Sequence, residues 1–195
     1  MELPLTELQW WEVPAVVLAV LYLLLAIRQN IWCWAAAAAS TLLYLFIMYK
    51  ASLYMESALQ LFYLGMAAYG WFQWRRGGAE GTGLAVTTWP FRYHLVAIVM
   101  VFLLVFVSGE LLTRYSSAAL PFLDSFTTWG AIVATWMVAR KILENWIYWF
   151  VIDAVSIYLY ISRDLYFTAV LFACYLVMIV IGYRSWRASM TENSA

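Results

Sequence analysis

Hydrophobic stretches long enough to cross a bilayer follow one another along almost the whole chain, and short charged or Gly/Pro-rich breaks separate them. A transmembrane helix needs roughly 20 predominantly apolar residues. The pattern therefore predicts an all-α integral membrane protein with seven transmembrane helices. Their expected ranges are 10–28, 30–49, 52–75, 92–113, 121–139, 144–162 and 165–187, and the one long polar connection is the Gly- and Thr-rich segment 75–92.

Composition supports the same class. Of the 195 residues, 66% are hydrophobic and only 11% are charged, whereas soluble domains average about 25% charged residues. The formal net charge of zero gives no electrostatic reason to expect nucleic acid as a partner. Cys33 and Cys174 lie within hydrophobic stretches, so we expect packing residues rather than a disulfide or a metal site.

Positively charged residues predict the orientation in the membrane. With seven spans, eight Lys and Arg residues fall on the face that holds the C-terminus, and three fall on the other face. Because cytoplasmic loops carry the excess of Lys and Arg, we expect the N-terminus outside and the C-terminus in the cytoplasm.

The chain contains an internal repeat. Residues 53–75 align without a gap on residues 165–187, which lie 112 positions later, with nine identities in 23 positions. The middle helices of the two halves are aligned with three residues inserted ahead of the second one. That insertion gives these pairs: Asn30 with Asn145, Trp34 with Trp149, and Thr41 with Ser156.

The repeat predicts the domain organisation. The expected parts are a first three-helix repeat over 1–76, a cytoplasmic linker with the fourth helix over 77–116, and a second three-helix repeat over 117–195. Four spans separate equivalent helices, so both repeats run the same way through the bilayer. Parallel repeats of this kind occur in SWEET-type transporters, whose substrate sites lie near the midplane at the repeat interface. A solvated cavity is therefore expected between the two repeats.

Polar and aromatic residues form stripes along three of the predicted helices, as helical spacing requires. The three sets are Asn145, Trp149, Asp153, Ser156 and Tyr160; Asn30, Trp34, Thr41 and Tyr44; and Glu56, Gln60, Tyr63, Trp71 and Trp74. Lipid cannot satisfy such groups, so the stripes are expected to face the cavity.

Some members of the stripes have two interpretations. Asp153 is either a structural carboxylate paired inside the bundle or a group that binds a substrate or a cation. Glu56, nearer the outer helix end, is either a surface charge or part of the site, whereas Gln60 has no packing reason for its mid-depth position and is assigned to the site. One of Trp146 and Trp149 is expected to stack on substrate, while the other packs or anchors at the interface.

The remaining polar candidates also have structural alternatives. Ser156 and Thr41 either bind substrate or hold helices together, and Asn30 and Asn145 either bind substrate or cap helix ends. A Trp ring beside a carboxylate suits a planar organic cation. The ring face attracts positive charge by about 0.5–2 kcal/mol when desolvated, and the carboxylate adds a charged partner for the cation.

Five motifs resemble the PnuC family of vitamin transporters. They are AYGWFQW (68–74), PFLDSF (121–126), ARKILENWIYW (139–149), DLY (164–166) and GYRSWR (182–187). The resemblance covers essentially the whole chain. It implies a SWEET-like fold of three, one and three helices, a bacterial inner-membrane location, a homotrimer, and facilitated diffusion of a vitamin precursor that cytoplasmic phosphorylation traps.

The resemblance leaves the substrate open between nicotinamide riboside, the first choice, and thiamine. Both are flat aromatic cations, so Trp149, Gln60 and Asn145 suit either. The rival classes are a membrane scaffold and an intramembrane enzyme. The sequence contains no HExxH, GxSxG, Walker or GxGD pattern, and its single histidine, His94, has no nucleophile on a shared predicted face. We therefore expect neither an enzyme nor a cofactor or metal.

Overall fold

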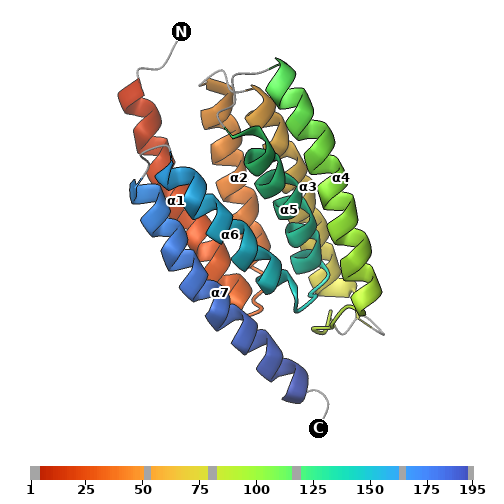
Figure 1. The fold of residues 1–195 in the computed structure, drawn as a ribbon. Helices are drawn as coiled ribbons and strands as arrows, with labels where there is room; N and C mark the ends of the chain where they lie inside the picture. Colours follow the sequence, from red (N-terminus) through yellow and green to blue (C-terminus); the bar gives the residue numbers. More distant parts are fainter. Residues whose placement is uncertain (1–4, 51–53, 79–82, 116–119, 163–165, 193–195) are drawn as a thin grey trace. The chain divides into compact units, whose positions relative to one another are not determined.

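The computed structural model describes residues 5–50, 54–78, 83–115, 120–162 and 166–192. These residues form seven α-helices (Figure 1). The helices are α1 (Leu5–Ile27), α2 (Cys33–Lys50), α3 (Tyr54–Arg76), α4 (Phe91–Tyr115), α5 (Pro121–Ala139), α6 (Asn145–Ile161) and α7 (Tyr166–Glu192). The predicted all-helical fold with seven helices is confirmed.

The helix bounds follow the predicted ranges, with differences at the ends that have physical reasons. The range of α5 is the predicted one, and α2 begins three residues late because Asn30 lies in the turn after α1. The last helix continues to Glu192, five residues beyond the prediction, because the charged residues that end an apolar stretch do not end a helix. By length and composition, α4 and the segment Thr168–Thr191 of α7 are apolar enough to span a membrane, with mean hydropathies of 2.7 and 1.7.

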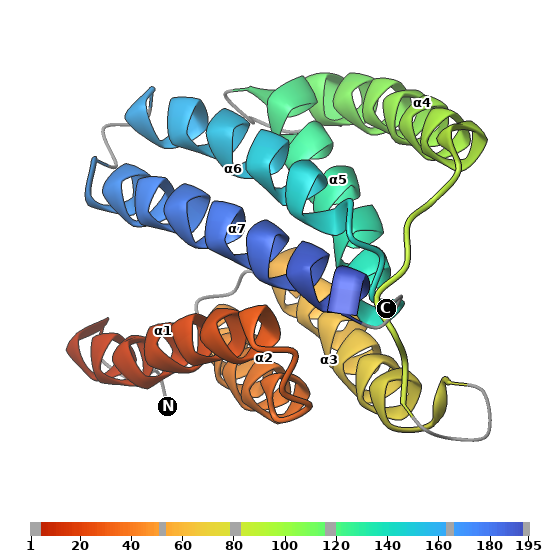
Figure 2. The ribbon, with the colours of Figure 1, turned by 90° about the horizontal axis from the view of Figure 1, so that it is seen from below.

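The chain divides into two compact units, Met1–Ala85 and Val86–Ala195. In the first unit, α2 packs against both α1 and α3. In the second unit, α4, α5, α6 and α7 pack in chain order, each against the next (Figures 1 and 2). The fourth helix thus packs against the first helix of the second repeat, to which a short connection joins it.

The turn between the first two helices of each repeat has the same backbone geometry in both units. Gln29 and Lys141, 112 positions apart, both have a positive φ, of 53° and 49°. At each turn the next amide bonds to a carbonyl five residues earlier, from Asn30 to Leu25 at 2.9 Å and from Ile142 to Met137 at 2.9 Å. This is the Schellman pattern that ends a helix on a left-handed residue.

A Trp–Gly–Trp contact is also repeated. Trp34 of α2 lies against Gly70 of α3, and its ring meets Trp74 edge-on with centroids 5.5 Å apart. In the second unit, Trp146 of α6 lies against Gly182 of α7 and meets Trp186 edge-on at 5.4 Å. A glycine is required at these crossings, because a Cβ atom would overlap the indole ring.

These two features correct the predicted alignment of the middle helices. Turns and Trp–Gly–Trp contacts both repeat at a constant spacing of 112 residues, so Trp34 corresponds to Trp146 and not to Trp149. The predicted three-residue insertion is wrong. Without the insertion, Asn145 corresponds to Cys33 and Asp153 corresponds to Thr41. With the insertion, Asp153 would have corresponded to an alanine.

The segment that precedes α4 is fixed to the turn between α5 and α6. The Thr87 amide donates to the Lys141 carbonyl at 3.0 Å, and the Leu143 amide donates to the Thr87 carbonyl at 2.8 Å. The Trp89 amide donates to Oε2 of Glu144 at 3.2 Å. The end of the predicted linker is therefore part of the folded second unit.

We predict that Gly182→Ala destabilises the protein because its methyl group would overlap the Trp146 ring. Overpacking costs about 1–3 kcal/mol, so the melting temperature in detergent should fall by roughly 2–10 °C. Gly65→Ala in α3 is the matched control, because nothing lies within 4 Å of its added methyl group. Equal melting temperatures for the two variants would contradict the Trp–Gly–Trp account.

Candidate functional site

Helix α6 separates a buried face from an exposed one. Its buried residues are Asn145, Trp146, Ile152, Asp153, Ser156 and Leu159. The exposed side carries apolar residues, including Ile147, Phe150, Val151 and Tyr158. The helix therefore turns its polar side chains inward and offers an apolar surface outward, which is the reverse of a helix in a water-soluble protein.

Asp153 lies on this buried face, with 5% of its surface exposed. Its carboxylate makes no hydrogen bond or ion pair with any residue that the structure describes. A buried, unpaired carboxylate is costly to keep in a fold. The predicted alternative of a structural carboxylate paired inside the bundle therefore has no partner among the described residues.

The two tryptophans of α6 take different roles. Trp146 is 2% exposed and is held between Gly182 and Trp186 of α7. Trp149 is half-buried and makes no ring contact with a residue that the structure describes. Trp149 lies one helical turn before Asp153, so their side chains are neighbours on one face. Of the predicted pair, Trp146 is thus the packing residue, and Trp149 has no ring partner among the described residues.

Asn145 begins α6 and is completely buried. Its Nδ2 donates to the Ile142 carbonyl at 2.6 Å, as the structural alternative of a helix-end residue requires. Its Oδ1 is buried and has no hydrogen-bond partner among the described residues. Ser156, three residues after Asp153 on the same face, is also buried. Asn145, Trp149, Asp153 and Ser156 thus form one continuous polar and aromatic face.

The predicted residues of α2 do not form an equivalent face. Trp34 is 2% exposed and packs against α3, with Tyr22 of α1 at 6.1 Å between ring centroids. Asn30 is exposed in the turn before the helix, where its Oδ1 accepts the Trp32 amide at 3.0 Å. Thr41 is buried and corresponds to Asp153 in the gapless repeat. The side chains of Trp34 and Asn30 are thus engaged within the first unit, whereas the substrate contact of Thr41 stays a prediction.

On α3, Gln60 and Tyr63 are half-buried. Glu56 belongs to the same helix, but its side chain lies outside the described residues. Trp71 is paired edge-on with the exposed Trp32 at 5.5 Å, and Trp74 with Trp34. Both tryptophans are thus engaged with other rings of the first unit.

The prediction missed a polar cluster at the N-terminal ends of α4 and α6. Nδ1 of His94 lies 3.0 Å from the Tyr148 hydroxyl, and Nε2 lies 4.0 Å from Oε1 of Glu144. The Trp89 ring meets the imidazole edge-on, with ring centroids 5.4 Å apart. The signal available in the sequence was a lone histidine and a glutamate just before an apolar helix. Their contact depends on the preceding segment folding back onto the turn, which spacing along the chain does not reveal.

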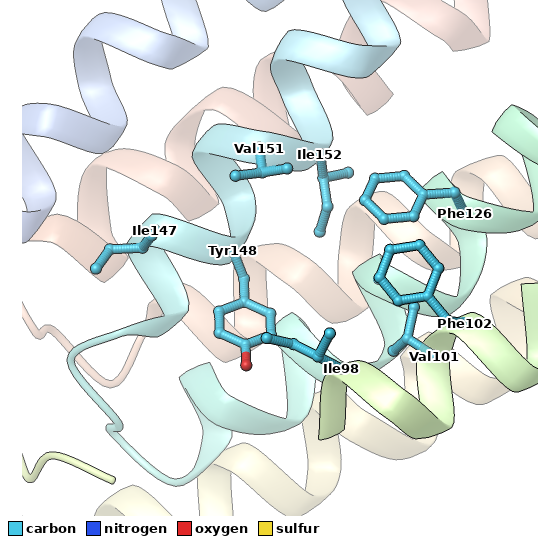
Figure 3. Close-up of a pocket in the computed structure, with 9 residues that line it drawn as sticks. Ile98, Val101, Phe102, Phe126, Ile147, Tyr148, Val151 and Ile152 are labelled. Carbon is cyan, nitrogen blue, oxygen red and sulfur yellow. The ribbon is translucent and has the colours of Figure 1, made fainter. Parts of the chain in front are cut away.

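A cavity of about 280 Å³ lies between α4, α5 and α6 (Figure 3). Its walls include Val101, Phe102, Phe126 and Ile152, and the Tyr148 hydroxyl is the one polar atom among the side chains labelled in Figure 3. It offers a cation no anionic partner. This cavity therefore does not have the carboxylate that the predicted site for a cation requires.

Comparisons with known proteins agree over nearly the whole chain. A sequence model of the nicotinamide mononucleotide transporter family matches residues 9–188. The riboflavin/roseoflavin transporter RibM of Streptomyces davaonensis is 28% identical over 182 residues, which cover 91% of this chain and 84% of RibM. The nicotinamide riboside transporter PnuC of Escherichia coli is 23% identical over an alignment of 214 positions, gaps included, that covers 97% of this chain and 90% of PnuC.

A solved structure shares the fold. The crystal structure of the vitamin B3 transporter PnuC superposes with a TM-score of 0.73 at 24% sequence identity. The match covers 94% of this chain and 83% of that chain. The chain therefore shares the fold of that structure.

We predict that Asp153→Asn raises the melting temperature of the purified protein, because the variant keeps the shape of the side chain and removes an unpaired buried charge. An unsatisfied buried group costs about 1–3 kcal/mol, so the increase should be a few degrees. Asp124→Asn is the control, because Asp124 lies in the first turn of α5, where the helix dipole favours a negative charge. A lower melting temperature for Asp153→Asn would assign the carboxylate a structural role.

Proposed function

The chain belongs to the nicotinamide mononucleotide transporter family, and we propose that it carries a planar cationic vitamin precursor, in first place nicotinamide riboside, across the membrane by facilitated diffusion. Membership makes the protein a membrane transporter of a small vitamin substrate. The cation preference rests on one observation, which is the buried carboxylate of Asp153 without a partner among the described residues.

A cationic substrate would give the Asp153 carboxylate the partner that it lacks. Nicotinamide riboside carries its positive charge on a flat pyridinium ring. The ring nitrogen bears the ribose and no hydrogen, so the contact with the carboxylate is electrostatic. Two unit charges about 4 Å apart attract each other by about 4 kcal/mol at an effective dielectric constant of about 20. The carboxylate would therefore stabilise the protein with bound substrate. In the protein without substrate, the unpaired charge would destabilise the fold.

Trp149 supports the same proposal. Its ring is half-buried, makes no ring contact with a described residue, and lies one turn from Asp153. A pyridinium stacked on an indole gains about 0.5–2 kcal/mol. We propose that Trp149 positions the flat ring of the substrate while Asp153 balances its charge.

Uncharged polar side chains suit the uncharged parts of the substrate. We propose that Ser156, Thr41, Gln60 and Tyr63 hydrogen-bond to ribose hydroxyls or to the carboxamide. Among the other predicted residues, Asn145 retains an unpaired Oδ1 that can accept a hydrogen bond. Trp34, Trp146 and Asn30 contribute through packing and turn geometry, because their side chains are engaged within their own units.

The direction of net transport would be set by the concentration gradient of the substrate and not by the transporter. The sequence has no nucleotide-binding motif that could couple transport to ATP. We propose that phosphorylation of the substrate in the cytoplasm keeps its free concentration low and so drives uptake. The excess of Lys and Arg supports a C-terminus in the cytoplasm of a bacterial inner membrane. We also propose that the protein forms a homotrimer, as the family resemblance implies.

Two other substrates define the alternatives. Thiamine is also a flat aromatic cation and would use the same two side chains. Riboflavin is favoured by the 28% identity to RibM, but its ring system is neutral and gives Asp153 no charge to balance. Nicotinamide riboside and thiamine therefore differ from riboflavin in charge, and they differ from each other in the size of the ring system.

We predict that proteoliposomes containing the protein take up labelled nicotinamide riboside, without added ATP or an ion gradient, until the inner and outer concentrations are equal. Riboflavin and thiamine are tested in parallel, and empty liposomes are the control. Accumulation above the outer concentration would contradict facilitated diffusion. Uptake of riboflavin alone would contradict the cationic substrate.

We predict that Asp153→Asn weakens the binding of nicotinamide riboside about 10- to 150-fold, which corresponds to a loss of about 1.5–3 kcal/mol of net electrostatic attraction between the carboxylate and the pyridinium ring. Trp149→Ala should weaken it about 2- to 30-fold, which corresponds to the loss of the cation–π contact. Binding is measured by isothermal titration calorimetry. Tyr158→Ala, an aromatic residue on the exposed side of the same helix, is the control and should bind normally. Similar losses for Tyr158→Ala and Trp149→Ala would count against the proposed face.

A further inference from the structure

A groove of about 440 Å³ runs between α6 and α7, outside the face just described. Its walls are formed by Trp146, Ile147 and Phe150 from α6 and by Ile179, Val180 and Tyr183 from α7. One end is lined by Arg184 and Arg187. The groove is thus apolar along most of its length and cationic at one end.

The apolar part of the groove lies where the protein meets lipid. Ile147, Phe150 and Val180 are exposed, and α7 is one of the helices long and apolar enough to span a membrane. From Ile179 to Arg187, α7 rises about 12 Å. The hydrocarbon of one leaflet is about 15 Å thick. The groove therefore has the length of an acyl chain segment that descends from the headgroup level into one leaflet.

The two arginines present unused hydrogen-bond donors at the headgroup level. Arg184 and Arg187 lie three positions apart on α7, so they point from the same side of the helix. Both are exposed, and neither guanidinium bonds to a residue that the structure describes. A guanidinium presents a planar fork of donors that matches a phosphate group.

From this combination we propose that the groove between α6 and α7 binds an anionic phospholipid. Its acyl chain would lie along Phe150 and Val180, and its phosphate would lie between Arg184 and Arg187. A net negative headgroup is favoured over a zwitterionic one because the site supplies two positive charges and no described carboxylate lines it. Basic pockets between transmembrane helices are a known form of headgroup site.

The groove borders the Trp–Gly–Trp contact of the second unit. Trp146 lines the groove and is the residue that Gly182 and Trp186 hold in place. A bound lipid would cover this contact between α6 and α7 on its membrane side. Lipid binding is therefore expected to stabilise the packing of the helix that carries Asp153, independently of which vitamin is transported.

The internal repeat supplies a comparison for the test. At the spacing of 112 residues, Arg187 corresponds to Arg75 at the end of α3, whereas Arg184 corresponds to Phe72. Both Arg75 and Phe72 are exposed. Arg75→Gln therefore removes an equivalent charge at a position that has no second arginine one turn earlier.

The test measures thermal stability and bound lipid on the full-length protein in detergent, with dioleoyl phosphatidylglycerol and dioleoyl phosphatidylcholine as probes. Phosphatidylglycerol should raise the melting temperature and stay bound in native mass spectrometry, whereas phosphatidylcholine should do neither. Each arginine near an anionic headgroup contributes about fivefold in affinity. The variant that carries both Arg184→Gln and Arg187→Gln should thus bind phosphatidylglycerol about 25-fold more weakly, while Arg75→Gln binds it like the unaltered protein.

A second variant keeps both charges and fills the groove. Val180→Trp should abolish retention of phosphatidylglycerol although the arginines remain. Inorganic phosphate is the third probe and should not raise the melting temperature, because it has no chain to bury. Equal stabilisation by the two lipids, an unchanged affinity in the double variant, or an equal effect of phosphate would each overturn the proposal. None of these results bears on vitamin uptake, so the lipid site and the proposed function can fail separately.

Discussion

The structure depends on one constraint, which is that a polar group inside a bilayer must find a partner in the protein, in trapped water or in a ligand. Most polar side chains of the second unit that lie away from water gather on one face of α6 or bond to nearby carbonyls, as Nδ2 of Asn145 does. The uncharged exceptions in the described part of the unit are Oγ of Ser125, Oδ1 of Asn145 and Nε1 of Trp146, which are buried without a hydrogen-bond partner. Asp153 is the charged exception, because it is buried without a partner in the described part of the chain. A transporter needs such a site, since a group already satisfied by the protein has little to offer a substrate.

The repeated backbone features explain how this exception is kept in place. The turn at Lys141 sets where α6 starts, and the contact of Trp146 with Gly182 and Trp186 fixes its rotation against α7. With those two points fixed, Trp149 and Asp153 must lie on the polar face. The first unit has the same turn and the same contact but carries Thr41 where the second carries Asp153. The two units thus share the turn and the Trp–Gly–Trp contact, and the carboxylate at this position occurs in the second unit alone.

Much of the fold could be predicted from hydropathy, because the bilayer imposes a length on each helix. The number of helices and the range of α5 follow from that alone. The site was harder to predict. The insertion that paired Trp34 with Trp149 was based on Asn and Trp identities. It did not take into account that each glycine of the repeat lies against a tryptophan of the neighbouring helix, so the two residues must be aligned as a pair. The contact of His94 with Glu144 and Tyr148 could not be predicted, since it needs the chain before α4 to fold back onto a distant turn.

A structure of the protein with bound nicotinamide riboside tests the central claim most directly. The account predicts the pyridinium ring within about 6 Å of the Trp149 ring centroid and the Asp153 carboxylate as the nearest anionic group. Asp153 turned to lipid or bonded to a basic side chain, with the ligand bound elsewhere, would contradict it.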